Sequence, residues 1–120
     1  ILASKLGASK IDAIDIDEWS KENTEENASL NQVENIKVWR GDLSSLHDKG
    51  YDCIFANITF NVISSSLTSL YSKLHQGGHL ITSGFFPTDA ERLKTQAETL
   101  GLRVIKESQK GDWACVYFQK

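Results

Sequence analysis

The stretch Ala13-Ile14-Asp15-Ile16-Asp17-Glu18-Trp19-Ser20, "AIDIDEWS", ends an apolar run with two acids that are separated by one residue. The run itself, residues 10–16, is short and apolar enough to predict a strand that is buried on both faces. Residues 18–30 are polar and helix-permissive, and Asp17 stands where the N-cap of such a helix is expected. A strand that passes directly into a helix indicates an α/β fold.

The rest of the chain repeats this alternation. We predict strands over residues 35–40, 51–58 and 79–85, helices over 59–74 and 87–100, and a glycine turn over 76–78. The run "YDCIFANI" is the most apolar and is predicted to be a central strand. Helices between buried strands imply right-handed crossovers and a mostly parallel sheet covered on both faces. The last two strands, "RVIKESQ" and "DWACVYFQ", predict a terminal antiparallel hairpin.

Composition narrows the class of protein. The chain has 120 residues and a formal net charge of −3, without a basic cluster, so direct binding of nucleic acid is not expected. Cys53 and Cys115 lack metal-type spacing and are predicted to be buried free thiols, which favours a reducing cytoplasm. No membrane-length apolar run is present. The opening, Ile1 to Gly7, resembles the last turns of a helix that Gly7 closes, and we interpret the chain as part of a longer protein.

The carboxyl ends of parallel strands are where ligands of such sheets bind. Asp15 ends the first predicted strand, and a carboxylate can accept hydrogen bonds from both hydroxyls of a ribose. The alternative is that Asp15 and Asp17 both cap the helix and face water. The sequence therefore predicts either a nucleoside site or a plain helix start at this position.

Two further polar positions follow predicted strands. Asp42, after Gly41, could accept a hydrogen bond from the exocyclic amine of an adenine, with Leu43 packed on the ring; the alternative is a common Gly-Asp turn. Asn57 ends the most apolar strand, where a buried amide needs a partner, or else it caps the next helix. Because these clusters all follow strands at one edge, we expect a ligand site there.

Other candidate residues carry less information. His47, His75 and His79 lack the spacing of metal ligands, so no metal site is predicted. Residues 83–86, "SGFF", could line the ligand pocket or form a turn. The three tryptophans are expected to pack in the core or at its edge.

Three segments together resemble the Rossmann-like S-adenosylmethionine-dependent methyltransferases: residues 13–43, residues 51–63 ("YDCIFANITFNVI") and residues 74–86 ("LHQGGHLITSGFF"). More closely, the chain is similar to the C-terminal catalytic domain of the ribosomal protein L11 methyltransferase family, often called PrmA. The "ANI" strand end, the "GGHLITSG" segment and the Gly-Asp-Trp hairpin carry the closer resemblance, which covers nearly the whole chain.

The resemblance implies the roles of individual residues. Asp15 would hold the ribose of S-adenosylmethionine, and Ile16 would pack on its adenine. Asp42 would meet the adenine amine, and Asn57 would lie beside the methyl donor and orient the incoming amine as a catalytic residue. It further implies a cytoplasmic enzyme whose substrate is a ribosomal protein.

The chain also departs from the pattern that the resemblance implies. The family has a first strand and a glycine-rich loop before the helix that Ile1 to Gly7 would complete, and it has an N-terminal domain that recognises the substrate. These parts are missing from the 120 residues. We therefore expect a three-layer α/β sandwich without its first strand: one truncated catalytic domain over residues 1–120. Alone, it is expected to be inactive and able to self-associate through the exposed sheet edge.

Three alternatives remain open from the sequence. The first is a methyltransferase that acts on another protein or on a small molecule. The second is a nicotinamide-dinucleotide domain, which also uses an acid at a strand end. The third is a non-catalytic interaction module, which predicts no binding of an adenosine-type ligand.

Overall fold

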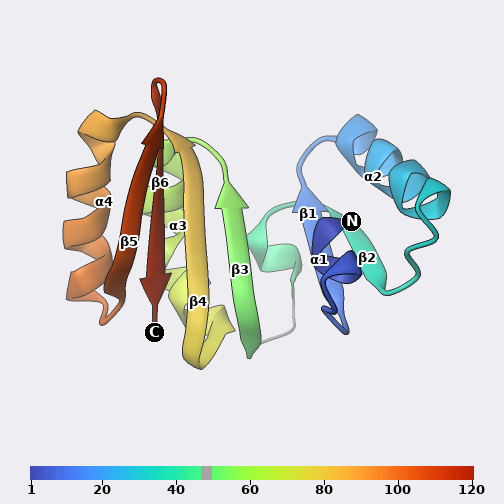
Figure 1. Cartoon of the computed structure of the whole chain (residues 1–120), viewed down its shortest axis with the longest axis horizontal. Helices are drawn as coiled ribbons and strands as arrows, with labels where there is room; N and C mark the ends of the chain where they lie inside the picture. The colour runs from blue at the N-terminus through green and yellow to red at the C-terminus, as the bar shows by residue number, and fades with distance from the viewer. Residues whose placement is uncertain (47–49) are drawn as a thin grey trace. The chain divides into compact units, whose positions relative to one another are not determined.

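The computed structural model describes residues 1–46 and 50–120, and the chain divides into two compact units, Ile1–His47 and Asp48–Lys120. The first unit contains α1 (Leu2–Lys5), β1 (Ile11–Asp15), α2 (Glu18–Leu30), β2 (Ile36–Arg40) and the short 3-10 helix η1 (Leu43–Ser45) (Figure 1). The second contains β3 (Tyr51–Asn57), α3 (Phe60–Lys73), β4 (Leu74–Phe85), α4 (Pro87–Thr99), β5 (Arg103–Lys110) and β6 (Trp113–Gln119). Whether residues 1–120 act as one domain stays a prediction.

In the first unit, β1 and β2 form a two-stranded parallel sheet with α2 as their connection. The register runs from Ile11 opposite Ile36 to Asp15 opposite Arg40. The prediction that Asp17 caps α2 is confirmed, because an Asp17 carboxylate oxygen accepts a hydrogen bond from the Trp19 N–H at 3.1 Å. The prediction that this strand is buried on both faces is wrong, since its residues are half-buried and Asp15 is exposed.

The second unit is a four-stranded sheet in the order β3-β4-β6-β5. β3 and β4 are parallel, whereas β6 runs antiparallel to both β4 and β5. The predicted terminal hairpin is therefore confirmed, and the sheet is mixed. The C-terminal residue is bonded to β4, because the Gly77 N–H donates to the Lys120 carbonyl at 2.8 Å.

The core of the second unit lies between the sheet and the helices α3 and α4. The two helices pack on each other, with the Ser64 hydroxyl donating to Gln96 at 2.8 Å. The largest fully buried side chains include residues from both helices and from β4 and β6: Ile63, Leu70, Leu80, Phe85, Leu93, Val116 and Phe118. Buried residues alternate along β4 and β6, so one face of these strands packs against the helices.

Three expectations about this sheet are wrong. β3 is its edge strand, not a central one, and Phe55 is 68% exposed because it points away from the face on which the helices pack. The same orientation leaves Cys53 exposed, and Cys115 is half-buried, so the two cysteines are free thiols as expected but are not buried. The predicted glycine turn at 76–78 is part of β4, whose backbone there pairs with Lys120. The apolar content of residues 51–58 therefore did not reveal which face of the strand the helices cover.

None of the described helices is long and apolar enough to cross a membrane.

Candidate functional site

Asp15 ends β1, and one of its two carboxylate oxygens is available to a ligand. Its Oδ1 accepts a hydrogen bond from the Asp17 N–H at 3.0 Å, which shapes the turn into α2. Within residues 1–46 and 50–120, Oδ2 makes no hydrogen bond or ion pair, and the side chain is exposed. Asp15 therefore does not cap α2, which Asp17 does, and it can accept further hydrogen bonds from a ligand.

Asp42 ends the loop after β2 and is tied to the turn that follows it. Its Oδ1 accepts from the Ser44 N–H at 2.8 Å and from the Ser44 hydroxyl at 2.5 Å. Both bonds hold the pKa of the Asp42 carboxyl below its ordinary value, and the bond from the Ser44 hydroxyl has the larger effect. Asp42 caps η1, so the turn interpretation is correct, and the ionised carboxylate still faces solvent as an acceptor.

The ends of β1 and β2 lie side by side. The Gly41 N–H donates to the Asp15 carbonyl at 2.9 Å, which joins the loop that carries Asp42 to the loop that carries Asp15. Ile16 is 76% exposed and Leu43 is half-buried, so apolar surface is available beside the two acids. The structure thus brings together four of the five residues predicted for the cofactor: Asp15, Ile16, Asp42 and Leu43.

Asn57, the fifth, ends β3 in the second unit. Its Oδ1 accepts a hydrogen bond from the Ser83 hydroxyl at 3.2 Å, and the Ile58 N–H donates to the Ser83 carbonyl at 3.1 Å. The helix after it begins at Thr59 as N-cap, so Asn57 does not cap α3. The side chain is exposed, contrary to the expectation of a buried amide. It is oriented by Ser83 and has hydrogen-bonding capacity left for a ligand.

A hollow of about 310 Å³ opens next to this strand end. It is lined by residues from the start of α3, the end of β4, α4 and the start of β6: Thr59, Phe60, Asn61, Gly84, Phe85, Phe86, Asp89, Arg92 and Trp113. Phe86 and Trp113 stack with ring centroids 5.5 Å apart and an interplanar angle of 12°. Both rings are more than half exposed. The hollow therefore joins an aromatic wall to a carboxylate, Asp89, that lies 3.7 Å from Arg92.

A family-wide sequence profile, described as ribosomal protein L11 methyltransferase (PrmA), matches residues 1–120. The chain belongs to this family. A ribosomal protein L11 methyltransferase of Porphyromonas gingivalis is 44% identical over 119 residues, which cover 98% of this chain and 41% of that protein. One from Campylobacter concisus is 36% identical over 120 residues, which cover 100% of this chain and 42% of that protein. The chain thus spans about two fifths of the curated relatives that it matches.

Solved structures of this family and of other methyltransferases share the fold of this PrmA-family chain. The ribosomal protein L11 methylase of Lactobacillus delbrueckii subsp. bulgaricus superposes with a TM-score of 0.90 at 28% identity, covering 97% of this chain and 60% of that one. A methyltransferase of Pyrococcus furiosus gives a TM-score of 0.82 at 21% identity, with 99% and 66% coverage. The predicted Rossmann-like methyltransferase fold is confirmed.

Sequence reasoning missed part of the site in this PrmA-family chain. Trp113 was expected to pack in the core or at its edge, yet it is 56% exposed and stacks on Phe86. The register provides the signal, because Phe85 pairs with Ala114 and so places the start of β6 beside the end of β4. Asp89 and Arg92 carried no signal, since a helical Asp and Arg three residues apart are common on exposed helix faces.

The histidines of this PrmA-family chain make local contacts. His75 Nε2 lies 2.7 Å from an Asp52 carboxylate oxygen, and His79 Nδ1 lies 2.8 Å from the Tyr117 hydroxyl. Within residues 1–46 and 50–120, no group of three or more His, Cys, Asp or Glu residues could hold a metal ion. His47 lies outside the described residues.

Gly84 sets the shape of the strand end, and we expect Gly84→Ala to be strongly destabilising. Gly84 has φ +92°, and an added Cβ would lie 2.9 Å from both the Asn57 amide oxygen and the Ile58 carbonyl oxygen. Backbone strain and overpacking together should lower the free energy of unfolding by about 2–4 kcal/mol. Urea denaturation measures this loss.

Gly111→Ala is the matched control in the same unit. Gly111 also has a positive φ, +58°, but nothing lies within 4 Å of its added Cβ. It should therefore lose only the strain, about 1–2 kcal/mol. Equal losses in the two variants would show that the contact with Asn57 and Ile58 is unimportant.

Proposed function

We propose that this chain carries the catalytic part of an S-adenosylmethionine-dependent methyltransferase that modifies amino groups of ribosomal protein L11. The observation that supports it most strongly is Asp15, an exposed carboxylate at the end of a parallel strand with Oδ2 available for a ligand, in a chain that matches this family over residues 1–120. Because the chain spans about two fifths of its relatives, the proposal concerns the protein at their length.

The residues at the ends of β1 and β2 fit the adenosyl group. Asp15 would accept hydrogen bonds from the ribose hydroxyls, which a carboxylate can do for two donors at once. Asp42, whose carboxyl pKa is lowered by the hydrogen bonds from Ser44, would accept from the adenine amine. Ile16 and Leu43 would supply apolar contact for the two faces of the ring. S-adenosylmethionine supplies a methyl group on a positively charged sulfur, which an amine nitrogen can attack directly.

In the transfer, the nitrogen–methyl bond forms as the sulfur–methyl bond breaks, and the sulfur leaves as a neutral thioether. The attacking amine must be neutral beforehand and gives up a proton afterwards to solvent. Asn57 would orient this amine through its amide oxygen, which Ser83 holds in place. In such a displacement, positioning and exclusion of water supply most of the acceleration.

The hollow beside Asn57 supports an amine on an aliphatic chain as the acceptor. The methylenes of a lysine side chain could lie on the exposed faces of Phe86 and Trp113, and the rings would attract its cationic nitrogen, whereas Asp89 is already paired with Arg92. A lysine ε-amine of ribosomal protein L11 is therefore the proposed acceptor. Another protein or small molecule as acceptor remains the alternative.

Several expectations about the setting stay predictions. They are a cytoplasmic location, the absence of direct nucleic-acid binding, inactivity of residues 1–120 by themselves, and self-association through an exposed sheet edge. β3 is such an edge in the second unit, with the exposed Phe55 on it.

The test is a methyl-transfer reaction with the protein at the length of its relatives. Purified ribosomal protein L11 is incubated with S-adenosylmethionine and the enzyme, and intact-mass spectrometry follows the product. We expect mass increases in steps of one methyl group, located on amino groups by fragmentation. Unchanged L11, with a folded enzyme that binds the cofactor, would favour the alternative acceptor.

A further inference from the structure

Two loops carry the proposed adenosyl site, residues 15–17 at the end of β1 and residues 41–43 after β2. One nucleoside can contact Asp15 and Asp42 together only if these loops keep a fixed spacing. The last pair of the parallel ladder is Asp15 opposite Arg40, so beyond it the strands no longer fix that spacing. A single backbone bond, from the Gly41 N–H to the Asp15 carbonyl, continues past the ladder.

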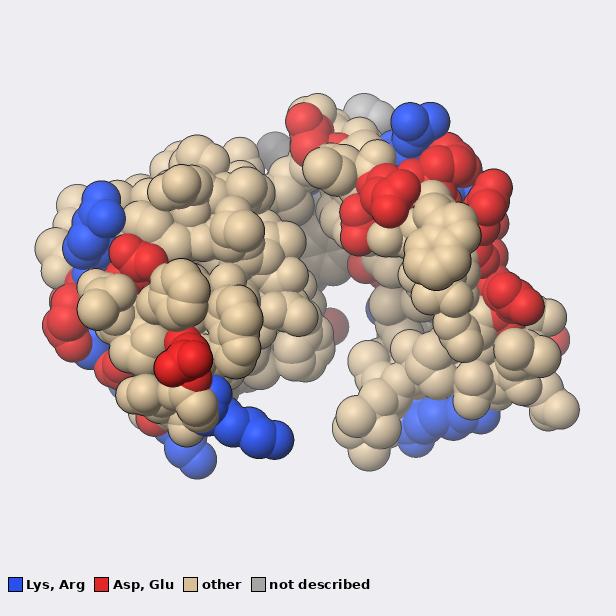
Figure 2. All heavy atoms as spheres, turned by 90° about the horizontal axis from the view of Figure 1, so that it is seen from above, with Lys and Arg blue, Asp and Glu red and all other residues tan. Residues whose placement is uncertain are grey.

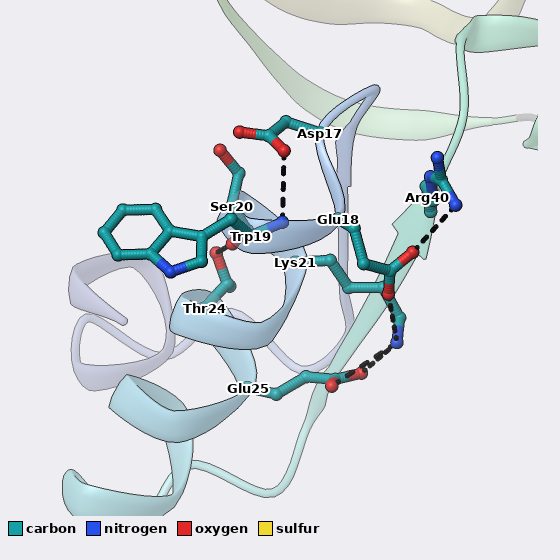
Figure 3. Close-up of polar contacts among 8 residues, drawn as sticks. All are labelled: Asp17, Glu18, Trp19, Ser20, Lys21, Thr24, Glu25 and Arg40. Atoms are coloured by element: carbon teal, nitrogen blue, oxygen red, sulfur yellow. Dashed lines mark hydrogen bonds and ion pairs between the residues drawn. The ribbon is translucent and has the colours of Figure 1, made fainter.

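A side-chain ion pair also joins the two elements next to these loops. Arg40, the last residue of β2, lies with its guanidinium nitrogen 3.0 Å from a carboxylate oxygen of Glu18, the first residue of α2 (Figure 3). Arg40 directly precedes Gly41 and Asp42, and Glu18 directly follows the N-cap Asp17. The pair therefore connects the chain next to one loop with the chain next to the other.

Glu18 is itself held in place by α2. Lys21 lies 3.8 Å from the other carboxylate oxygen of Glu18 and 3.3 Å from Glu25, so the four charges form a connected network (Figure 3). The helix carries four glutamates and one lysine, and acidic side chains gather over this unit (Figure 2). The Arg40 side chain therefore lies against a negatively charged surface, and Glu18 is the residue that pairs with it.

We propose that the Glu18–Arg40 ion pair positions the two adenosyl-binding loops, so that both residues are positioning residues for cofactor affinity without touching the cofactor. This inference rests on the proposed function. Both side chains are largely exposed, 46% for Glu18 and 61% for Arg40, and exposed pairs contribute little to stability. Loss of the pair should therefore affect the geometry of the site more than folding.

The experiment uses the protein at the length of its relatives and titrates it with S-adenosylhomocysteine by calorimetry. Glu18→Gln and Arg40→Gln should each weaken binding about three- to tenfold, and the double variant should be no weaker than either. Arg40→Lys, which keeps a positive charge opposite Glu18, should bind within about threefold of wild type. In turnover assays, KM for S-adenosylmethionine should rise by the same factor with kcat changed less than twofold.

Glu107→Gln is the matched control. Glu107 pairs with Lys94 at 2.7 Å and joins α4 to β5 in the second unit, so it is also a helix-to-strand ion pair, in which Glu107 is 39% and Lys94 19% exposed. Its loss should leave cofactor affinity unchanged. If wild type binds and the Glu18 and Arg40 variants bind within twofold of it, the inference is overturned and the proposed function stands. If folded wild type does not bind at all, both fail.

Discussion

Asp15→Ala should weaken binding of S-adenosylhomocysteine by about 100-fold in the protein at the length of its relatives. The variant removes a charged acceptor that would hold two ribose hydroxyls, and hydrogen bonds to charged groups contribute about 1.5–3 kcal/mol each. Folding should change little, because Asp15 is exposed and its recorded bond is to the Asp17 N–H. Calorimetric titration gives the dissociation constant, and thermal melting reports the stability.

Asp17→Ala separates this role from the helix cap. Asp17 is two residues away and caps α2 through the Trp19 N–H. The cap variant should lose about 1 kcal/mol of unfolding free energy and change affinity less than about threefold. The 2′-deoxy analogue of the ligand sharpens the test. Wild type should bind this analogue less well than the parent ligand, whereas Asp15→Ala should bind the two ligands about equally. Equal discrimination by both proteins would place the ribose elsewhere.

Asn57→Ala should lower kcat for methyl transfer by about 100-fold while KM for S-adenosylmethionine changes little. The amide is proposed to orient the attacking amine, and a misplaced reacting group costs on the order of 100-fold in rate. The measurement is the initial rate of methyl incorporation into ribosomal protein L11 at saturating cofactor.

Two variants calibrate that result. Ser83→Ala removes the hydroxyl that donates to the Asn57 amide oxygen at 3.2 Å, and it should lower kcat by less than tenfold. Asn27→Ala removes an exposed amide on α2 that bonds back to Asn23, and it should not affect the rate. If Asn57→Ala retained more than half of wild-type kcat, the amide would have no part in orienting the amine.

Local patterns predicted the elements well, because their signals lie within a few residues. Asp17 caps α2, Pro87 begins α4, and the turn between β5 and β6 forms the predicted hairpin. Asp15 and Asp42 could be placed together from the sequence because parallel strands end at one edge. Each of these inferences needed only spacing along the chain and the strand direction.

Burial could not be predicted in the same way, because it depends on which elements lie against a strand. Phe55 and Cys53 sit in the most apolar run but on a face that the two helices of their unit do not cover. The exposed stack of Phe86 and Trp113 depends on the register between β4 and β6. The Glu18–Arg40 pair likewise joins residues that only the alignment of β1 with β2 brings together.

The most direct test of the account is calorimetric titration of the wild-type protein, at the length of its relatives, with S-adenosylhomocysteine. The account predicts saturable binding of one ligand per chain, because the ends of β1 and β2 present Asp15 and Asp42 together. A folded protein that shows no binding would contradict the adenosyl site and, with it, the proposed methyltransferase.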